Sequence, residues 1–225
     1  MQFIDKVGVE VEGGWNDGNL PSASPGGTVC SDGSLNFSSS DGFSITAREF
    51  VSNPFSNLVD LADWMRRIYP PHTNQTCGLH VHVSLKSPLN YARIIDQRFQ
   101  KYFTQELGAW GDRANIKNKY FRMRLEGSHH FCKNEWKPEA QMKATGKDSN
   151  VRFCIWNFCW GVRKTAECRV LPTFKNPQVA VAAVMQVAKI VENYLKYSPI
   201  LLAVEDIRMD DGSDMPQELI DLMKE

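Results

Sequence analysis

The sequence lacks an excess of charge of either sign, and it lacks long apolar runs. Its 225 residues carry 26 Lys and Arg against 26 Asp and Glu, a formal net charge of zero. No bulk attraction to nucleic acid or to an anionic membrane is therefore expected. No apolar run reaches the roughly 20 residues that cross a bilayer, and residues 1–11 have neither the basic start nor the leucine-rich stretch of a secretion signal. We expect a cytoplasmic protein.

Two kinds of short motif are also missing. The six cysteines form no Cys-x-x-Cys pair, so we predict that they are free thiols in the core rather than disulfides or zinc ligands. There is no Gly-x-x-x-x-Gly-Lys-Ser/Thr sequence either, and a P-loop for nucleotide phosphates is therefore excluded.

The composition is that of an ordinary folded domain, with 42% hydrophobic, 23% charged and 11% aromatic residues. Strand and helix patterns alternate irregularly and without repeats, which favours a single α+β domain over residues 1–225. Within it, 108–150 has weak periodicity and nine Lys or Arg against five Asp or Glu. We predict that this segment is a long basic loop or lid, and that 205–225 is a C-terminal extension.

Four stretches alternate with period two, which is the pattern of a half-buried strand. Each places charged or imidazole side chains on one face: Glu10 and Glu12 in 7–12, Glu49 in 45–51, His80 and His82 in 79–85, and Glu167 with Arg169 in 166–170. Three helices are predicted from apolar residues at helical spacing, over 58–69, 87–107 and 176–195. Residues 13–44, which are rich in Gly, Ser, Asn and Asp, are predicted to be a loop.

Paired carboxylates on one strand face repel each other unless a positive group lies between them. Each pair by itself is more often an ordinary exposed face, and Glu-x-Arg by itself is usually a surface ion pair. Together, on neighbouring strands, they form a surface of carboxylates and imidazoles, which favours a site for hard divalent cations. On this account Glu167→Gln should relieve repulsion and leave the stability of the metal-free protein level or raised.

Five motifs occur in a fixed order: Gly-Val-Glu-Val-Glu at 8–12, Ser-Asp-Gly-Ser-Leu at 31–35, Glu-Phe-Val-Ser-Asn-Pro at 49–54, Cys-Gly-Leu-His-Val-His-Val-Ser at 77–84 and Glu-Cys-Arg-Val-Leu-Pro-Thr at 167–173. In this order they resemble the amidoligase family, carboxylate–amine ligases with the catalytic fold of glutamine synthetase and glutamate–cysteine ligase. The resemblance implies a curved antiparallel sheet, with the metal and ATP site on its concave face and helices packed on the other. It also implies ATP-dependent amide-bond formation through an acyl phosphate, with two divalent cations, Mg2+ or Mn2+.

The resemblance assigns the metal ligands residue by residue. Glu12 and Glu49 would hold the cation beside the substrate carboxylate. Glu10, His80 and Glu167 would hold the cation that orients the ATP phosphates.

The resemblance implies further roles around these ligands. His82 would lie near the ATP phosphates, and Arg169 would contact the transferring phosphoryl group or the substrate carboxylate. Asp32 would face the substrate or the incoming amine and could accept its proton. One or two phosphate-facing arginines are expected between His82 and Glu167. The sequence offers Arg113, Arg122, Arg124 and Arg152 without a motif that selects among them; we favour Arg113, followed by Arg122 and Arg124.

The sequence leaves alternatives open for both the substrates and the reaction class. The expected partners are a carboxylate and an amine, each a small molecule or a peptide, and a modified nucleotide stays open as a substrate. The sequence leaves the oligomeric state open. The alternative reaction is that of a metal-dependent hydrolase, because His-x-His with carboxylates also binds zinc, although zinc sites usually recruit three or four His or Cys. A binding module without catalysis is the third reading, and it leaves the carboxylates without a counter-charge.

Overall fold

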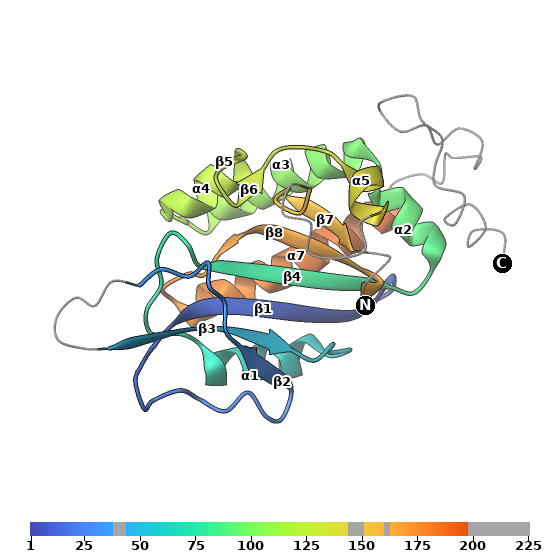
Figure 1. Ribbon diagram of the computed structural model, residues 1–225. Coiled ribbons are helices and arrows are strands. Elements are labelled where there is room, and N and C mark those ends of the chain that lie inside the picture. The colour runs from blue at the N-terminus through green and yellow to red at the C-terminus, as the bar shows by residue number, and fades with distance from the viewer. Residues whose placement is uncertain (38–43, 144–150, 160–162, 198–225) are drawn as a thin grey trace.

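An antiparallel sheet of six strands organises the protein (Figure 1). The computed structural model describes residues 1–37, 44–143, 151–159 and 163–197. The extension predicted at 205–225 lies outside the described residues. In spatial order the strands are β2 (Gly27–Cys30), β3 (Ile45–Ser52), β1 (Ile4–Asn16), β4 (Gly78–Leu85), β8 (Thr165–Pro172) and β7 (Trp156–Cys159).

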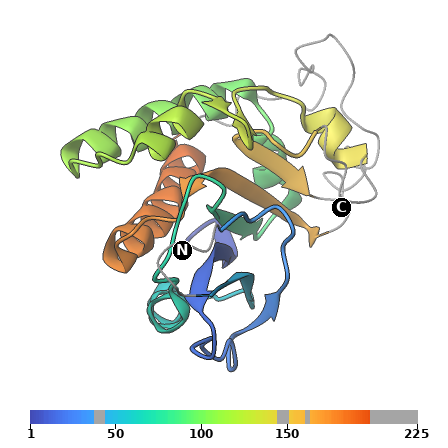
Figure 2. The same cartoon turned by 60° about the vertical axis from the view of Figure 1, so that its left-hand side comes forward.

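Helices cover one face of this sheet. Both α1 (Leu58–Ile68) and α7 (Pro177–Tyr197) pack against the central strand β1, and α2 (Pro88–Ile94) packs against β4. Figure 2 shows α1 and α7 side by side on one side of the sheet. The longer α3 (Gln97–Arg113) packs against α2 and α7. None of the described helices is both long enough and apolar enough to cross a membrane.

The hydrophobic core lies between the sheet and these helices. Alternating apolar side chains of β1 and β4, among them Val9 and Val81, are buried and at most 1% exposed at these two positions. They belong to one core cluster with the Ala and Val side chains of α7. The helices begin where the sequence predicts: the side chain of Ser87 caps α2, with Pro88 at the first position, and Asn176 accepts a hydrogen bond from Gln178 N (2.8 Å) before α7. The predicted α+β class and the four predicted strands are therefore confirmed.

The helix predicted over 87–107 is two helices. The backbone leaves the helical path at Asp96, whose side chain accepts a hydrogen bond from Arg98 N at 2.8 Å and thereby caps α3. An Asp that caps a helix satisfies backbone N–H groups that a continuous helix would have bonded internally. The prediction missed this break because the apolar spacing continues across it.

The prediction that 108–150 is a loop is wrong over its described residues. After the end of α3 the segment forms α4 (Lys119–Leu125), the hairpin of β5 (Ser128–His129) and β6 (Cys132–Lys133), and α5 (Pro138–Lys143). Residues 144–150 lie outside the described part. Helices of six or seven residues make fewer than two turns and leave little periodicity in the sequence, which explains the error. In the same way, β2 lies within the loop predicted at 13–44, of which 38–43 are not described.

The described cysteines agree only in part with the prediction of buried thiols. Cys77, Cys132, Cys154 and Cys168 are buried and free, whereas Cys30 is free but exposed on β2. None of these five forms a disulfide. Cys30 ends the edge strand β2 and lies across from Glu49 of β3.

Candidate metal centre

The register of the sheet brings the charged side chains of four strands together on the face opposite the helices. Glu10 of β1 lies directly across from His80 of β4, and Glu12 lies across from Glu49 of β3. On the other side of β4, His82 lies across from Glu167 of β8. Directly opposed residues have side chains that are close enough to interact. The predicted face of carboxylates and imidazoles therefore exists.

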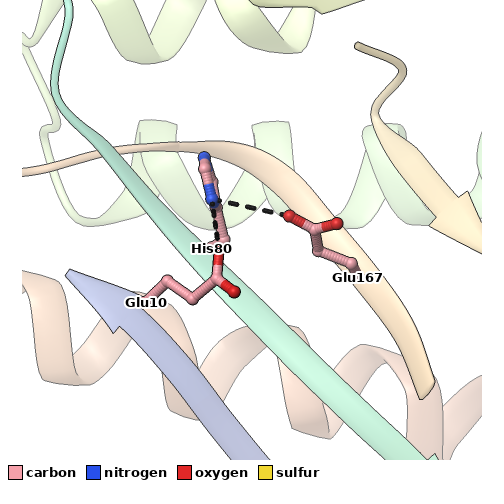
Figure 3. A group of neighbouring side chains, drawn as sticks. All are labelled: Glu10, His80 and Glu167. Carbon is pink, nitrogen blue, oxygen red and sulfur yellow. Dashed lines mark hydrogen bonds and ion pairs between the residues drawn. The ribbon is translucent and has the colours of Figure 1, made fainter. Parts of the chain in front are cut away.

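These side chains form two groups that could hold a metal ion, and His80 belongs to both. Glu10, His80 and Glu167 are all buried, while the second group joins Glu12 and half-buried Glu49 to His80. In each group, one ligand atom from every residue lies within 4.8 Å of the others. His80 Nδ1 is 3.1 Å from Glu10 Oε2 and 3.5 Å from Glu167 Oε1 (Figure 3). The groups match the two ligand sets that the resemblance implies, with His80 added to the second.

A glycine makes room for this arrangement. Gly78 begins β4, and its backbone N–H donates to Glu12 Oε2. A Cβ atom at this position would lie 2.5 Å from His80 Nε2 and 3.1 Å from Glu12 Oε2. The Oγ1 of Thr173 lies 2.8 Å from both Glu12 O and Gly78 O and shares its one proton between them, which ties β1 to β4 beside the site. Only a residue without a side chain fits between His80 and Glu12.

The pKa values of three carboxylates in the centre are shifted in different directions. Burial acts to raise the pKa of Glu10, but hydrogen bonds with His80 and His82 outweigh it and hold that pKa well below the usual range. Burial is likewise outweighed at Glu167, where the charge of Arg169, followed by the two histidines, lowers the pKa to about 2. For Glu12 burial prevails over the charge of His80, and its pKa is raised. The first group is therefore held ionised by its neighbours, while Glu12 is less well compensated.

A cavity of about 680 Å³ opens above these ligands. One side is formed by the loop after β2, where Asp32 accepts a hydrogen bond from Ser34 N at 2.8 Å. The lining also includes four arginines, Arg124, Arg152, Arg163 and Arg169. The cavity thus joins an acidic floor to a basic wall, an arrangement suited to a cation together with an anionic ligand.

Two of these arginines are buried. Arg169 pairs with Glu167 and is 8% exposed. Arg124 is 1% exposed and donates to the backbone oxygens of Arg169 (3.2 Å) and Cys77 (3.3 Å). The Nε atoms of both are buried without a hydrogen-bond partner among the described residues.

Other predicted residues lie outside the lining of this cavity. Arg113 is exposed at the end of α3, and Arg122 pairs with Asp112 at the surface. His82 Nε2 lies 3.2 Å from Glu10 Oε1, and its Nδ1 lies 3.2 Å from Thr165 Oγ1. His82 therefore contacts a candidate metal ligand, whereas the resemblance implies a place near the phosphates.

Two residues of the site were missed by sequence reasoning. Asn157 of β7 donates from Nδ2 to Glu167 Oε2 at 2.8 Å. Its position as the one amide side chain in an aromatic-rich strand could have marked it as a site residue. Arg163, just before β8, places Nη1 2.6 Å from Glu10 Oε1. No sequence pattern marks Arg163, because the contact spans 153 positions of the chain.

No family model, curated protein or solved structure matches this chain significantly. The resemblance to amidoligases therefore stays a prediction, and the function is argued below from residues and geometry.

Proposed function

We propose that the protein is an ATP-dependent carboxylate–amine ligase that forms an amide bond with the help of two divalent cations. The observation that carries the proposal is the pair of ligand groups sharing His80, on the floor of a cavity whose wall carries buried arginines. A reaction that brings a triphosphate and a carboxylate together needs both kinds of charge: cations to offset repulsion, and fixed donors for the moving phosphoryl oxygens.

The donor set fits magnesium or manganese better than zinc. Four of the five ligands are carboxylates, and each group contains a single imidazole. Hard cations prefer oxygen ligands, whereas catalytic zinc usually takes three protein ligands rich in His. When bound, such cations would neutralise the charge that keeps a carboxylate away from a triphosphate.

The arginines supply the donors. Arg169 lines the cavity, and its Nη1 donates to Glu167, so its guanidinium is held beside the place where an anion would bind. The contacts of Arg124 with two backbone oxygens hold its guanidinium in place before any ligand arrives. Donors fixed in advance need little reorganisation as charge develops on the phosphoryl group.

The proposed reaction has two steps. An oxygen of the substrate carboxylate attacks the γ-phosphorus of ATP, the bond to the bridging oxygen breaks, and ADP leaves. The amine nitrogen then attacks the carbonyl carbon of the acyl phosphate, the C–O bond to phosphate breaks, and inorganic phosphate leaves. Asp32, which lines the same cavity, would accept the proton that the amine loses.

ADP release tests the proposal. The protein is incubated with ATP, Mg2+ or Mn2+, and pools of carboxylates and amines; we expect ADP release that requires a carboxylate and increases with an amine. Glu12→Gln should abolish it, while Asp5→Asn, an exposed carboxylate on the same strand, should not. Absence of ADP release with every pool would contradict the ligase. Cleavage of an amide or ester without ATP, supported by zinc, would favour the hydrolase instead.

A further inference from the structure

Arg163 is a partly exposed basic residue that contacts the metal centre. Its Nη1 lies 2.6 Å from Glu10 Oε1, and the Arg163 side chain is 45% exposed while that of Glu10 is 8% exposed. The guanidinium therefore approaches a buried metal ligand from the solvent side of the cavity, whose lining includes Arg163.

The other contacts of Glu10 show which side of its carboxylate the Arg163 guanidinium occupies. Glu10 Oε2 lies 3.1 Å from His80 Nδ1, and Oε1 lies 3.2 Å from His82 Nε2. The two histidines thus approach the carboxylate from β4, and Arg163 approaches it from the cavity. A cation that binds Glu10 through Oε1 would compete directly with the guanidinium for that oxygen.

We infer that Arg163 is a built-in counter-cation that holds Glu10 in the metal-free protein and is displaced when a divalent cation binds. The inference relies on the metal centre of the proposed function, but not on its ligase chemistry. If Arg163 stayed in place, its positive charge would lie within a few ångströms of the incoming divalent ion. Like charges at that distance repel strongly.

Comparison with Arg169 shows why one arginine can leave and the other cannot. Arg169 also pairs with a ligand of this group, Glu167, but its side chain is 10% exposed and its guanidinium lies over the Phe153 ring, 5.6 Å from the centroid. Moving Arg169 would leave a charge buried without its partner, which is costly. Moving Arg163 returns a half-exposed guanidinium to water, where an ion pair contributes little.

Metal affinity measured by calorimetry with Mn2+ alone tests this inference. Arg163→Gln removes the competing charge but keeps a polar side chain, so Mn2+ should bind about tenfold more tightly than to the wild type. Arg163→Lys keeps the charge and should stay close to the wild type. Arg66→Gln is the matched control, because Arg66 is 48% exposed and pairs with Asp63; its affinity should be unchanged.

Thermal melting supplies a second readout that does not depend on turnover. Without metal, Arg163→Gln should melt earlier than the wild type, because Glu10 loses its counter-charge; saturating Mn2+ should abolish that difference. Equal or weaker Mn2+ binding by Arg163→Gln would overturn the inference, as would an equal gain in affinity for Arg163→Lys. Absence of Mn2+ binding in all variants would overturn it as well. Tighter binding by Arg163→Gln without ADP release in any variant would uphold the inference and count against the ligase.

Discussion

Both faces of the sheet carry buried side chains, but the groups that surround those side chains differ. On the helix face, Val9, Val81 and Cys168 are at most 1% exposed and contact other apolar groups. On the opposite face, which carries the candidate metal centre, Glu10 and Glu167 are 6% and 3% exposed, yet their neighbours are imidazoles and guanidiniums. The same strands therefore carry a core and a charged site back to back.

This difference indicates what each face contributes. Burial of apolar groups stabilises the fold through area removed from water. Buried charges stabilise it only while each keeps its partner, and the loss of one partner is costly. Substitutions on the helix face should therefore lower stability and leave metal binding unchanged. Substitutions on the face of the candidate metal centre should change metal binding and charge balance.

The largest effect is expected at His80, which belongs to both ligand groups. His80→Asn should weaken Mn2+ binding by about 100-fold or more, because even residues that only support a metal ligand contribute 10- to 100-fold. Leu79→Ala, one residue away in the core, should cost about 2 to 4 kcal/mol of stability and leave the affinity unchanged. Calorimetry and urea unfolding measure the two effects. Comparable losses of affinity in both variants would mean that the two faces are not separable.

The next effect concerns Glu167, for which the structure reverses the sequence-based expectation. Glu167→Gln should lower the unfolding free energy of the metal-free protein by about 3 kcal/mol, because buried Arg169 loses its counterion. A double variant with Arg169→Met should recover much of this loss, because it removes the unpaired charge. Urea unfolding without metal measures both variants. If Glu167→Gln were as stable as the wild type or more stable, repulsion among the carboxylates would be the dominant effect after all.

Val170 supplies the counterpart on the same strand. Its side chain is fully buried in the hydrophobic core, so Val170→Ala should cost about 1 to 3 kcal/mol through lost burial and a small cavity. Mn2+ affinity of the folded variant should stay within a factor of about two, because no ligand changes. A large loss of affinity in this variant would show that Val170 positions the neighbouring site residues.

The smallest effect is a pH dependence from a buried histidine near Arg124. His129 of β5 is buried, and burial, followed by the charge of Arg124, lowers its pKa to about 4. In the unfolded chain the pKa returns to about 6.5, so the unfolded state takes up the proton first and stability falls as the pH drops from 6.5 towards 4. Between pH 7 and 5.5 this should amount to about 1 kcal/mol. His129→Asn, compared with its own stability at pH 7, should lose that slope; an unchanged slope would assign it to other groups.

The strands could be predicted because alternation is a local property of extended backbone. Residues 7–12 and 79–85 place their carboxylates and imidazoles on one face whatever partner strand they acquire. The helix starts at Pro88 and Pro177 could be predicted for a similar reason, since cap and proline act within one turn.

The wall of the cavity could not be predicted in this way. Arg124 reaches the site from a helix of seven residues, in a segment whose own pattern suggests a loop. Arg113, which the resemblance favours, lies exposed at the end of α3. The choice among the arginines depends on where α4 packs against β8, and that packing joins residues about 45 positions apart.

A bulge in β8 shows the same limit within a strand. Leu79 pairs with Leu171 and Val81 pairs with Cys168, so two steps along β4 match three along β8. Strict alternation would place Leu171 on the face of Glu167 and Arg169, whereas the extra residue turns it into the core beside Leu79. The sequence by itself determined which residues could share a charged face, because alternation needs no partner. Only the tertiary structure decided which of them meet, because strand register, the bulge and the placement of short helices depend on contacts between distant parts of the chain.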